Sequence, residues 1–446
     1  MSEFTVLANT RIDEHDVSAA VISKLTWKLV PFLFLLYMVA YLDRINVGFA
    51  ALQMRGQLHF NDRVYGLGAG IFFAGYFFFQ IPSNLAVQRL GARRWISLLM
   101  VIWGLISAST MFVTTPRSFY IFRFLLGAAE AGFFPGLILY VKDWFPIRLR
   151  GRTVARFMAA GPLAGVIGGP FSGVLLSFNG HAGLAGWQWL FLLEGMPAVI
   201  MGILVLNYLS DRPEDTPWLT LTEKQWLRST LDSEKTLAHH TAFKTSSAPF
   251  TSGPIWLLAF VVFGASTCTS GITLWLPTLI HSRSAAGNFA VGVLAAIPFL
   301  AAVVGMTAVA LHSDSTGERR WHVTIAGLSG AAALAAVSYL TSFTGTMIAI
   351  TIAVVCAYAI FGPFWALAST LVEGSAAATG VALINSVGNL GGFFGPYAIG
   401  LVRNSTGSFR GGFLAIAITL VLSAVIVPFI RGVPRSSRGN SPEKLI

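Results

Sequence analysis

A series of twelve long apolar runs is the feature of this sequence that most limits its fold. A helix that crosses the hydrocarbon core of a bilayer needs about 20 apolar residues, and the runs are of that order. Only 11% of the residues are charged, whereas about 25% is usual for a soluble domain. Disorder, a collagen-like repeat and a secreted disulfide scaffold are therefore excluded. We expect an all-α membrane protein whose twelve transmembrane helices lie at about 27–52, 64–87, 95–114, 118–141, 153–178, 187–209, 255–281, 289–311, 321–343, 346–371, 378–402 and 410–430.

A polar stretch divides these runs into two sets of six. We expect an N-terminal tail, a first six-helix bundle, a central loop, a second six-helix bundle and a C-terminal tail, at 1–26, 27–209, 210–252, 253–430 and 431–446. Residues 1–24 are mostly polar, and the run that follows them is too long for the apolar core of a signal peptide. The first run is therefore expected to be a retained span.

The basic residues indicate an orientation. If the N-terminus is cytoplasmic, the inner segments hold 22 of the 30 Lys and Arg residues and the outer loops hold six. Lys and Arg concentrate in the cytoplasmic loops of membrane proteins. We therefore expect both termini to be cytoplasmic and read the net charge of +11 as an orientation signal. Basic loops without interleaved aromatic residues give no case for a nucleic-acid partner.

The two halves repeat one another. Gly91-Ala-Arg-Arg-Trp95 matches Gly317-Glu-Arg-Arg-Trp321 at an offset of 226 residues. At the same offset, Gly165, Gly169 and Pro170 match Gly391, Gly395 and Pro396. Two separate matches at one offset favour a duplication, and two parallel six-helix halves are the internal symmetry of the major facilitator fold.

One loop in each half carries a resemblance. Asp314-Ser-Thr-Gly317-Glu-Arg319-Arg320 resembles the signature loop of the major facilitator superfamily. The equivalent loop, Gln88-Arg89-Leu-Gly91-Ala-Arg93-Arg94, has Gln88 where the acidic residue usually stands. The resemblance implies a gating role for both loops, assigned here to Arg89, Gly91, Arg93, Asp314, Gly317 and Arg319.

Four further segments resemble the anion:cation symporter family within that superfamily, over about residues 24–430. They are Tyr41-Leu-Asp43-Arg44-Ile-Asn46, Pro82-Ser-Asn84, the stretch from Arg123 through Glu130 to Pro135, and Gly186-Trp-Gln-Trp189-Leu-Phe-Leu-Leu-Glu194-Gly. The resemblance implies a proton-coupled carrier of an organic anion such as tartrate, phthalate or a sugar acid.

The predicted spans of the first half include four charged residues that lie well inside two of the runs, on the first and the fourth span. A charge at mid-bilayer costs roughly 2.5–3.5 kcal/mol even on a mild scale, so Asp43, Arg44, Arg123 and Glu130 need partners or water. The helical rise places the Asp43–Arg44 pair between Arg123 and Glu130 in depth, where the charges can neutralise one another. The offset of 226 places uncharged residues at the equivalent positions of the second half, so the fold does not require the charges; these residues are Thr269, Ser270, Ala349 and Cys356. We therefore interpret the four charges as functional rather than as an ion-pair network that only fixes helix register.

The chemistry of these side chains suggests roles. Arg44 offers a planar fork of donors for a substrate carboxylate, as the family resemblance also implies. Asp43 and Glu130 are the candidate proton carriers, and Arg123 would hold one of them deprotonated. Weaker substrate-binding candidates are Tyr41, Tyr76, Asn385 and Asn389. Helix–helix contacts are assigned to Gln80 and Asn46, and a capping or structural role to Glu194.

Together these features predict a secondary transporter that takes up a small organic anion with protons by alternating access. A hydroxylated dicarboxylate such as tartrate is the first expectation, and an aromatic carboxylate (phthalate or hydroxyphenylacetate type) or a sugar acid is the alternative. A non-transporting sensor or a passive channel is the rival from another class. The sequence has no phosphate-binding loop, catalytic triad or metal-ligand spacing, so we expect no enzyme activity, cofactor or metal. We expect a monomer in the lipid bilayer of a bacterial inner membrane.

Overall fold

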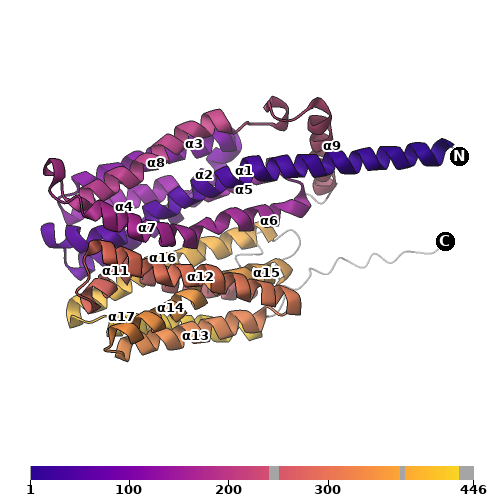
Figure 1. The fold of residues 1–446 in the computed structure, drawn as a ribbon. Helices are drawn as coiled ribbons and strands as arrows, with labels where there is room; N and C mark the ends of the chain where they lie inside the picture. The colour runs from indigo at the N-terminus through magenta and orange to yellow at the C-terminus, as the bar shows by residue number, and fades with distance from the viewer. Residues whose placement is uncertain (1, 241–250, 372–376, 431–446) are drawn as a thin grey trace.

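The computed structural model describes residues 2–240, 251–371 and 377–430. These residues form α-helices joined by short turns and 3-10 segments, and no strand occurs among them. Figure 1 shows two bundles side by side, with the first half of the chain above and the second half below. The first bundle contains α1 Ser2–Gln57, α2 Asp62–Leu90, α3 Ala92–Ser109, α4 Pro116–Glu130, α5 Phe133–Trp144, α6 Ile147–Met158, α7 Ala160–Leu176 and α8 Gly186–Tyr208.

The second bundle follows a connecting helix, α9 Leu221–His240. Its helices are α11 Gly253–Arg283, α12 Asn288–Thr316, α13 Arg320–Tyr339, α14 Phe343–Ala359, α15 Phe361–Leu371, α16 Ala377–Thr406 and α17 Arg410–Ile426. Below, the end of the bundles near α9 is called the α9 end and the opposite end the far end; Figure 1 shows α9 beside the N-terminal half of α1.

The expected all-α membrane fold is confirmed. Among the described residues, eleven helices or joined helix pairs are long and apolar enough to cross a bilayer. The remaining predicted span is α16, which has 30 residues and packs against α11 and α2. It is less apolar because it contains Asn385, Ser386 and Asn389 together with several glycines. The twelve predicted spans thus all correspond to helical segments.

Three of these spans are broken, each about four residues before a proline. α4 ends before Pro135, α6 ends before Pro162, and α14 ends before Pro363. Proline has no N–H for the carbonyl four residues earlier, and its ring clashes with that carbonyl. The prolines in the sequence therefore explain all three breaks, whereas we predicted these three runs as continuous spans.

Two segments that were predicted as polar connections are helical. α1 begins at Ser2, so the predicted tail continues directly into the first span. The predicted central loop contains α9, whose Leu227 and Leu231 are buried. Two ion pairs tie α9 to the first bundle: Lys24 with Glu223 and Arg150 with Glu234, each at 2.8 Å. Apolar residues at helical spacing within 221–231 were the signal for this helix. The predicted tail at 431–446 lies outside the described residues.

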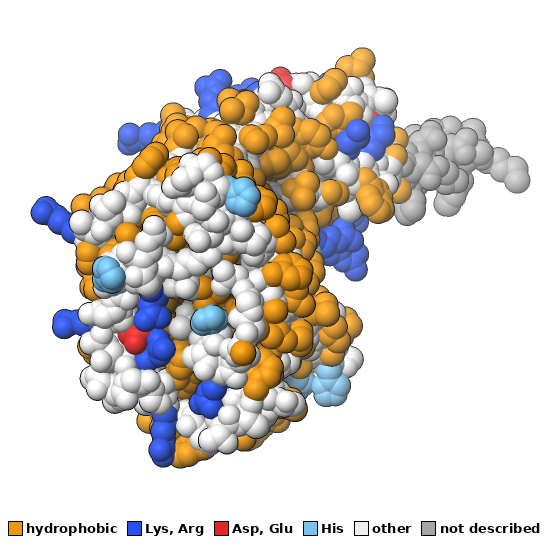
Figure 2. Space-filling model, turned by 60° about the vertical axis from the view of Figure 1, so that its left-hand side comes forward, with side chains coloured by type: hydrophobic (Ala, Val, Ile, Leu, Met, Phe, Trp, Pro, Cys, Tyr) orange, Lys and Arg blue, Asp and Glu red, His pale blue; other side chains and the backbone are white. Residues whose placement is uncertain are grey.

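Hydrophobic side chains cover the sides of the molecule. Figure 2 shows them as a belt, with more polar surface on the far end, which is turned towards the viewer. Phe78, Ile81, Val304 and Ile418 are all at least 60% exposed. Exposure of such large apolar side chains is expected where the surrounding medium is lipid.

Glycines bring the two bundles into close contact. A Cβ on Gly66 of α2 would lie 2.7 Å from the Pro396 carbonyl of α16, and one on Gly169 of α7 would lie 2.5 Å from the Gly292 carbonyl of α12. Small residues allow this approach of helix backbones in membranes. At the far end, Asp62 of α2 forms ion pairs with both Arg55 of α1 and Arg403 of α16. The far end of the interface between the bundles is therefore closed.

Candidate functional site

A buried ion pair joins α1 to α4. Nε of Arg44 lies 2.7 Å from Oε2 of Glu130. The Glu130 carboxyl is fully buried, whereas the Arg44 side chain is 19% exposed. Glu130 is the last residue of α4, directly before the break caused by Pro135. The pair brings together the two residues predicted to bind a carboxylate and to carry a proton.

Aromatic rings surround the Arg44 guanidinium. Its carbon atom lies 5.1 Å from the ring centre of Tyr41, 5.6 Å from that of Phe72 and 5.3 Å from that of Tyr76. Such cation–π contacts stabilise an arginine at depth without using its N–H donors. Tyr41 and Tyr76, the predicted substrate-binding tyrosines, therefore lie beside Arg44.

Arg123 also lies beside the Phe72 ring. Its guanidinium carbon is 5.0 Å from that ring, and its Nε donates to the Gly68 carbonyl at 3.4 Å. Within the described residues, Arg123 Nη1 and Glu130 Oε1 have no hydrogen-bond partner. Arg123 and Glu130 are thus both buried, without a direct ion pair between them in the described part of the chain.

Asp43 faces a different set of neighbours from Arg44. Its carboxyl accepts from Trp103 Nε1 at 3.1 Å, from Ser107 Oγ at 2.7 Å and from Asn46 Nδ2 at 3.5 Å. No ion pair joins Asp43 to an arginine in the described ranges. The expected mutual neutralisation of four charges therefore takes the form of one direct pair, Arg44 with Glu130, while Asp43 is satisfied by neutral donors.

The two asparagines of α16 lie on its face towards the first bundle. Asn385 and Asn389 are half-buried and share a helix face with Gly392, where an added Cβ would lie 2.4 Å from the Phe73 ring of α2. On the same helix, Ser386 donates to Gln80 of α2 at 2.9 Å. The asparagines are therefore placed beside the interface between the bundles, and Gln80 bridges it.

The second bundle contributes residues that the sequence did not single out. Tyr358 of α14 lies near Tyr41 of α1 and Thr273 of α11. Tyr358 stands two residues after Cys356, the repeat equivalent of Glu130. That equivalence was the available signal that this part of α14 faces the interface between the bundles.

The two signature loops differ in their ion pairs. In the second half, Arg319 pairs with Asp314 at 2.7 Å within the loop. In the first half, where Gln88 replaces the acidic residue, Arg93 pairs with Asp211 after α8 at 3.0 Å, and Arg89 is exposed. Gly91 and Gly317 both have positive φ, at +80° and +69°, where their helices end. Glycine suits these positions because other residues are strained there.

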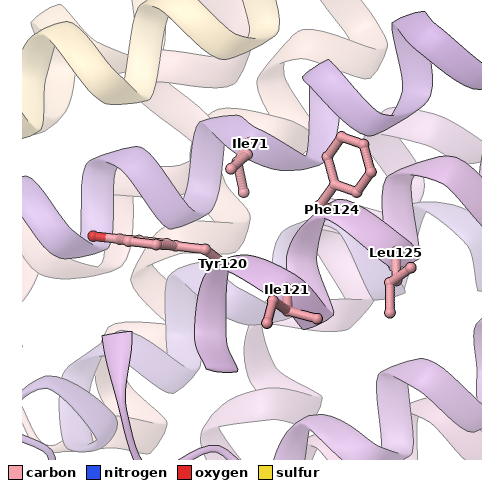
Figure 3. A pocket seen from close by; sticks show the side chains of 5 residues that line it. All are labelled: Ile71, Tyr120, Ile121, Phe124 and Leu125. Atoms are coloured by element: carbon pink, nitrogen blue, oxygen red, sulfur yellow. The ribbon is translucent and has the colours of Figure 1, made fainter. Parts of the chain in front are cut away.

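The apolar pocket in Figure 3 is separate from this site. Ile71 of α2 and the α4 residues Tyr120, Ile121, Phe124 and Leu125 line it. Ile121 and Leu125 are 48% and 44% exposed on the side of the bundle. The pocket contains none of the buried charges and has the character of a lipid-facing groove. In the described part of the chain, no three His, Cys, Asp or Glu side chains are grouped as a metal site.

Two apolar helical bundles, with a buried ion pair inside the first and Arg44 still partly exposed, define a membrane transporter rather than an enzyme. The family model of the Major Facilitator Superfamily matches residues 33–396. The chain belongs to the major facilitator superfamily.

Relatives and solved structures agree with this assignment. A protein of Agrobacterium vitis named "Putative tartrate transporter" is 47% identical over 412 residues, covering 92% of this chain and 91% of its own. The "Quinolone resistance transporter" of Acinetobacter baumannii is 37% identical over 92% of this chain and 95% of its own. The crystal structure of a bacterial homologue of the human lysosomal transporter Spinster, inward-facing and occupied, has a TM-score of 0.75 at 16% identity, covering 91% of this chain and 97% of that one.

Proposed function

We propose that this transporter takes up a small organic anion together with protons, and that a hydroxylated dicarboxylate such as tartrate is its substrate. The observation that carries the proposal is the contact between Arg44 and Glu130 at 2.7 Å. An arginine fork matches a carboxylate geometrically, and here an internal carboxylate already occupies part of the fork. Substrate and Glu130 therefore compete for the same guanidinium.

This competition couples binding to protonation. Ionised Glu130 holds Arg44 through Nε. A proton on Glu130 removes the negative charge, and Arg44 then offers all its donors to the substrate carboxylate. When the proton leaves, Glu130 attracts Arg44 again and the substrate is released. Asp43, one residue away on α1, is the second proposed proton carrier. Arg123 supplies the positive charge that favours loss of the proton from a nearby carboxyl.

The remaining polar groups suit a small hydroxylated anion. Arg123 Nη1 is a buried donor without a partner among the described residues, so it is available to a second carboxylate. Tyr41 and Tyr76 offer hydroxyl groups beside Arg44, and Asn385 and Asn389 offer amides from α16. The Agrobacterium vitis relative is named for tartrate, at 47% identity.

The orientation and the transport cycle belong to the same proposal. We place both termini and α9 on the cytoplasmic side of a bacterial inner membrane, because most Lys and Arg residues lie at that end. The bundles would be those predicted from sequence, 27–209 and 253–430, working as a monomer. With the far end closed by Asp62 and Arg403, the described state would open inward. The Arg93–Asp211 and Arg319–Asp314 pairs would then stabilise the arrangement at the α9 end.

The proposal is tested with purified protein in lipid vesicles. An inward proton gradient should drive accumulation of radiolabelled tartrate, and a protonophore should abolish it. Arg44→Lys keeps the charge but loses the fork, so the affinity for tartrate should fall by about 1.5–3 kcal/mol, roughly ten- to hundredfold. The control is Arg117→Lys at an exposed position of α4, which should transport normally. Uptake that does not depend on the proton gradient would refute the proposed coupling.

An aromatic carboxylate is the second candidate, because Tyr41, Phe72 and Tyr76 lie within 5.1–5.6 Å of Arg44. Such rings could pack against a substrate ring as well as against the guanidinium. A competition assay distinguishes an aromatic carboxylate from tartrate as the substrate. Unlabelled phthalate that inhibits uptake more strongly than unlabelled tartrate would favour the aromatic substrate.

A further inference from the structure

A second carboxyl group is buried behind the proposed site. Glu194 of α8 is only 2% exposed, and its Oε1 accepts a hydrogen bond from Ser172 Oγ of α7 at 2.7 Å. Its Oε2 is buried and has no hydrogen-bond partner among the described residues. The repeat gives Leu420 and Ala398 at the equivalent positions of Glu194 and Ser172. The fold therefore builds these helices equally well without the polar pair.

Asn46 connects Glu194 to Asp43. All three side chains are at most 2% exposed. The Asn46 amide nitrogen lies 3.5 Å from Asp43 Oδ1, and the Asn46 side chain also lies near Glu194 without a hydrogen bond to its free oxygen. The Asn46 oxygen, Oδ1, has no hydrogen-bond partner within the described residues. The amide thus lies between two carboxyl groups, and its equivalent in the second half is Ile272.

No base neutralises this group directly. In the described ranges, neither Asp43 nor Glu194 forms an ion pair. The ionisable group acting on Glu194 is Asp43, and those acting on Asp43 are Glu130 and Arg123 of α4. The neighbouring side chains of α3 and α7 are neutral: Trp103, Ser107 and Ser172. Two uncompensated carboxylates in such a place would carry a large desolvation cost.

One proton satisfies both unpartnered oxygens. A carboxylate oxygen and an amide oxygen are both acceptors, so they repel unless a hydrogen lies between them. We propose that Glu194 is a proton-binding residue whose carboxylic acid donates to Asn46, while the Asn46 amide donates to Asp43. Glu194 is then neutral when Asp43 is ionised.

A metal ion fits these atoms less well than a proton. Both oxygens of Asp43 already accept hydrogen bonds, from Trp103 and Ser107. Glu194 Oε2 and Asn46 Oδ1 remain, and hard cations usually take about six oxygen ligands. A single proton needs only the two oxygens that are free.

The arrangement can exchange its proton. If Asp43 takes up a proton, the Asn46 amide can turn so that its oxygen accepts from Asp43 and its NH2 group donates to Glu194. Glu194 then gives up its own proton to water, so its O–H bond breaks as that of Asp43 forms, and the pair holds one proton before and after. Glu194 acts on the site through Asn46 and Asp43, so it is a positioning residue. Its link to transport rests on the proton coupling proposed above.

Infrared spectroscopy tests the protonation without reference to transport. Purified protein in lipid vesicles at neutral pH, without substrate, should show a carbonyl-stretch band of protonated carboxylic acid that moves down on transfer to D2O. Glu194→Gln should remove one such component. Asn46→Leu should keep it but shift it to higher frequency, because the acceptor is lost. Glu318→Gln is the control. Although burial would raise the pKa of Glu318, hydrogen bonds from Trp321 and His322 hold it below its usual value, so this group is ionised and the band should stay.

Each result decides the proposal. An unchanged acid band in Glu194→Gln would overturn it, and so would an acid band that disappears in wild type when sodium is added. If Glu194→Gln does not fold, the shift in Asn46→Leu decides. A separate uptake measurement should show a flatter pH profile for tartrate uptake in Glu194→Gln than in wild type. If the acid band is present but uptake does not depend on the proton gradient, Glu194 still binds a proton, and only the proposed coupling is refuted.

Discussion

Arg44 and Glu130, 86 residues apart in the chain, meet through one hydrogen bond of 2.7 Å between Nε and Oε2. The contact uses one of the five N–H donors of the guanidinium. The side chain of Arg44 keeps 19% of its surface exposed, while Glu130 is fully enclosed. The Glu130 carboxyl is therefore shielded, whereas the Arg44 guanidinium remains accessible. This is expected if the protonation state of Glu130 controls whether Arg44 can bind a substrate.

Glu130→Gln should separate binding from proton coupling. Glutamine resembles protonated glutamate, so Arg44 should stay free for substrate at every pH. In vesicles, accumulation of tartrate driven by a proton gradient should fall to the level without a gradient, whereas exchange of internal for external tartrate should continue.

Glu234→Gln is the matched control, because Glu234 pairs with Arg150 outside the site. It should leave gradient-driven uptake intact. Full gradient-driven uptake by Glu130→Gln would remove Glu130 from the mechanism, and unchanged passive flux in that variant would favour a channel.

Asp62→Asn should open the far end. Asp62 is the acid shared by Arg55 of its own bundle and Arg403 of the other. A hydrogen bond to a charged group contributes about 1.5–3 kcal/mol, so its loss should shift the balance between inward- and outward-open states roughly ten- to hundredfold.

Spin labels at Arg117 and Asn404, both exposed near the far end, can measure that shift after Cys268 and Cys356 are replaced by serine. A larger share of long distances is expected in Asp62→Asn. An identical distance distribution in both proteins would show that this ion pair does not hold the bundles together.

Gly127→Val should destabilise the first bundle. A Cβ on Gly127 of α4 would lie 1.8 Å from the Phe72 carbonyl of α2, so the two helices would have to separate. Overpacking typically costs about 1–3 kcal/mol, and the Phe72 ring beside Arg44 would move with its backbone. Thermal unfolding in detergent should show a lower midpoint. Gly151→Ala, in an open helical position of α6, should not lower it, since alanine favours helix; equal midpoints for Gly127→Val and wild type would contradict the close packing.

The contact between α9 and α1 should weaken in acid. Burial would raise the pKa of Glu223, but the hydrogen bonds from Lys24 and Thr220 outweigh it, so the pKa lies below its usual value. A depressed pKa contributes stability above the unfolded-state value of about 4.3, and this is lost as pH falls through the lower folded value. Hydrogen exchange of α9, corrected for intrinsic rates, should therefore rise below about pH 4. Glu223→Gln should remove this pH dependence and Glu214→Gln should not; a dependence that persists in Glu223→Gln would assign it to another group.

Sequence reasoning grouped the buried charged residues of the candidate site but could not assign their partners. Helical rise alone placed Asp43 and Arg44 at the depth of Arg123 and Glu130. It could not assign the pairs, because successive residues of a helix point about 100° apart. Arg44 turns towards α4 and Glu130, whereas Asp43 turns towards Trp103 and Ser107 of α3.

Glu194 shows the same limit. Sequence reasoning assigned it a capping or structural role because of its place in the span, 151 residues from Asp43 along the chain. Its relation to Asp43 depends on Asn46, which sequence reasoning treated as a helix contact. A bridge of three side chains from two helices has no periodic signature, so only packing of α1 against α8 reveals it.

The sequence by itself determined the membrane fold, the two repeated halves and the small set of charges at depth. Hydrophobic length and the cost of burying charge act locally, so they can be read along the chain. The tertiary structure decided which charges meet, where the bundles touch and which acids lack a base. Those properties depend on the rotation and approach of helices far apart in sequence. The glycine contacts that set this approach, such as Gly127 against Phe72, become visible only when both helices are in place.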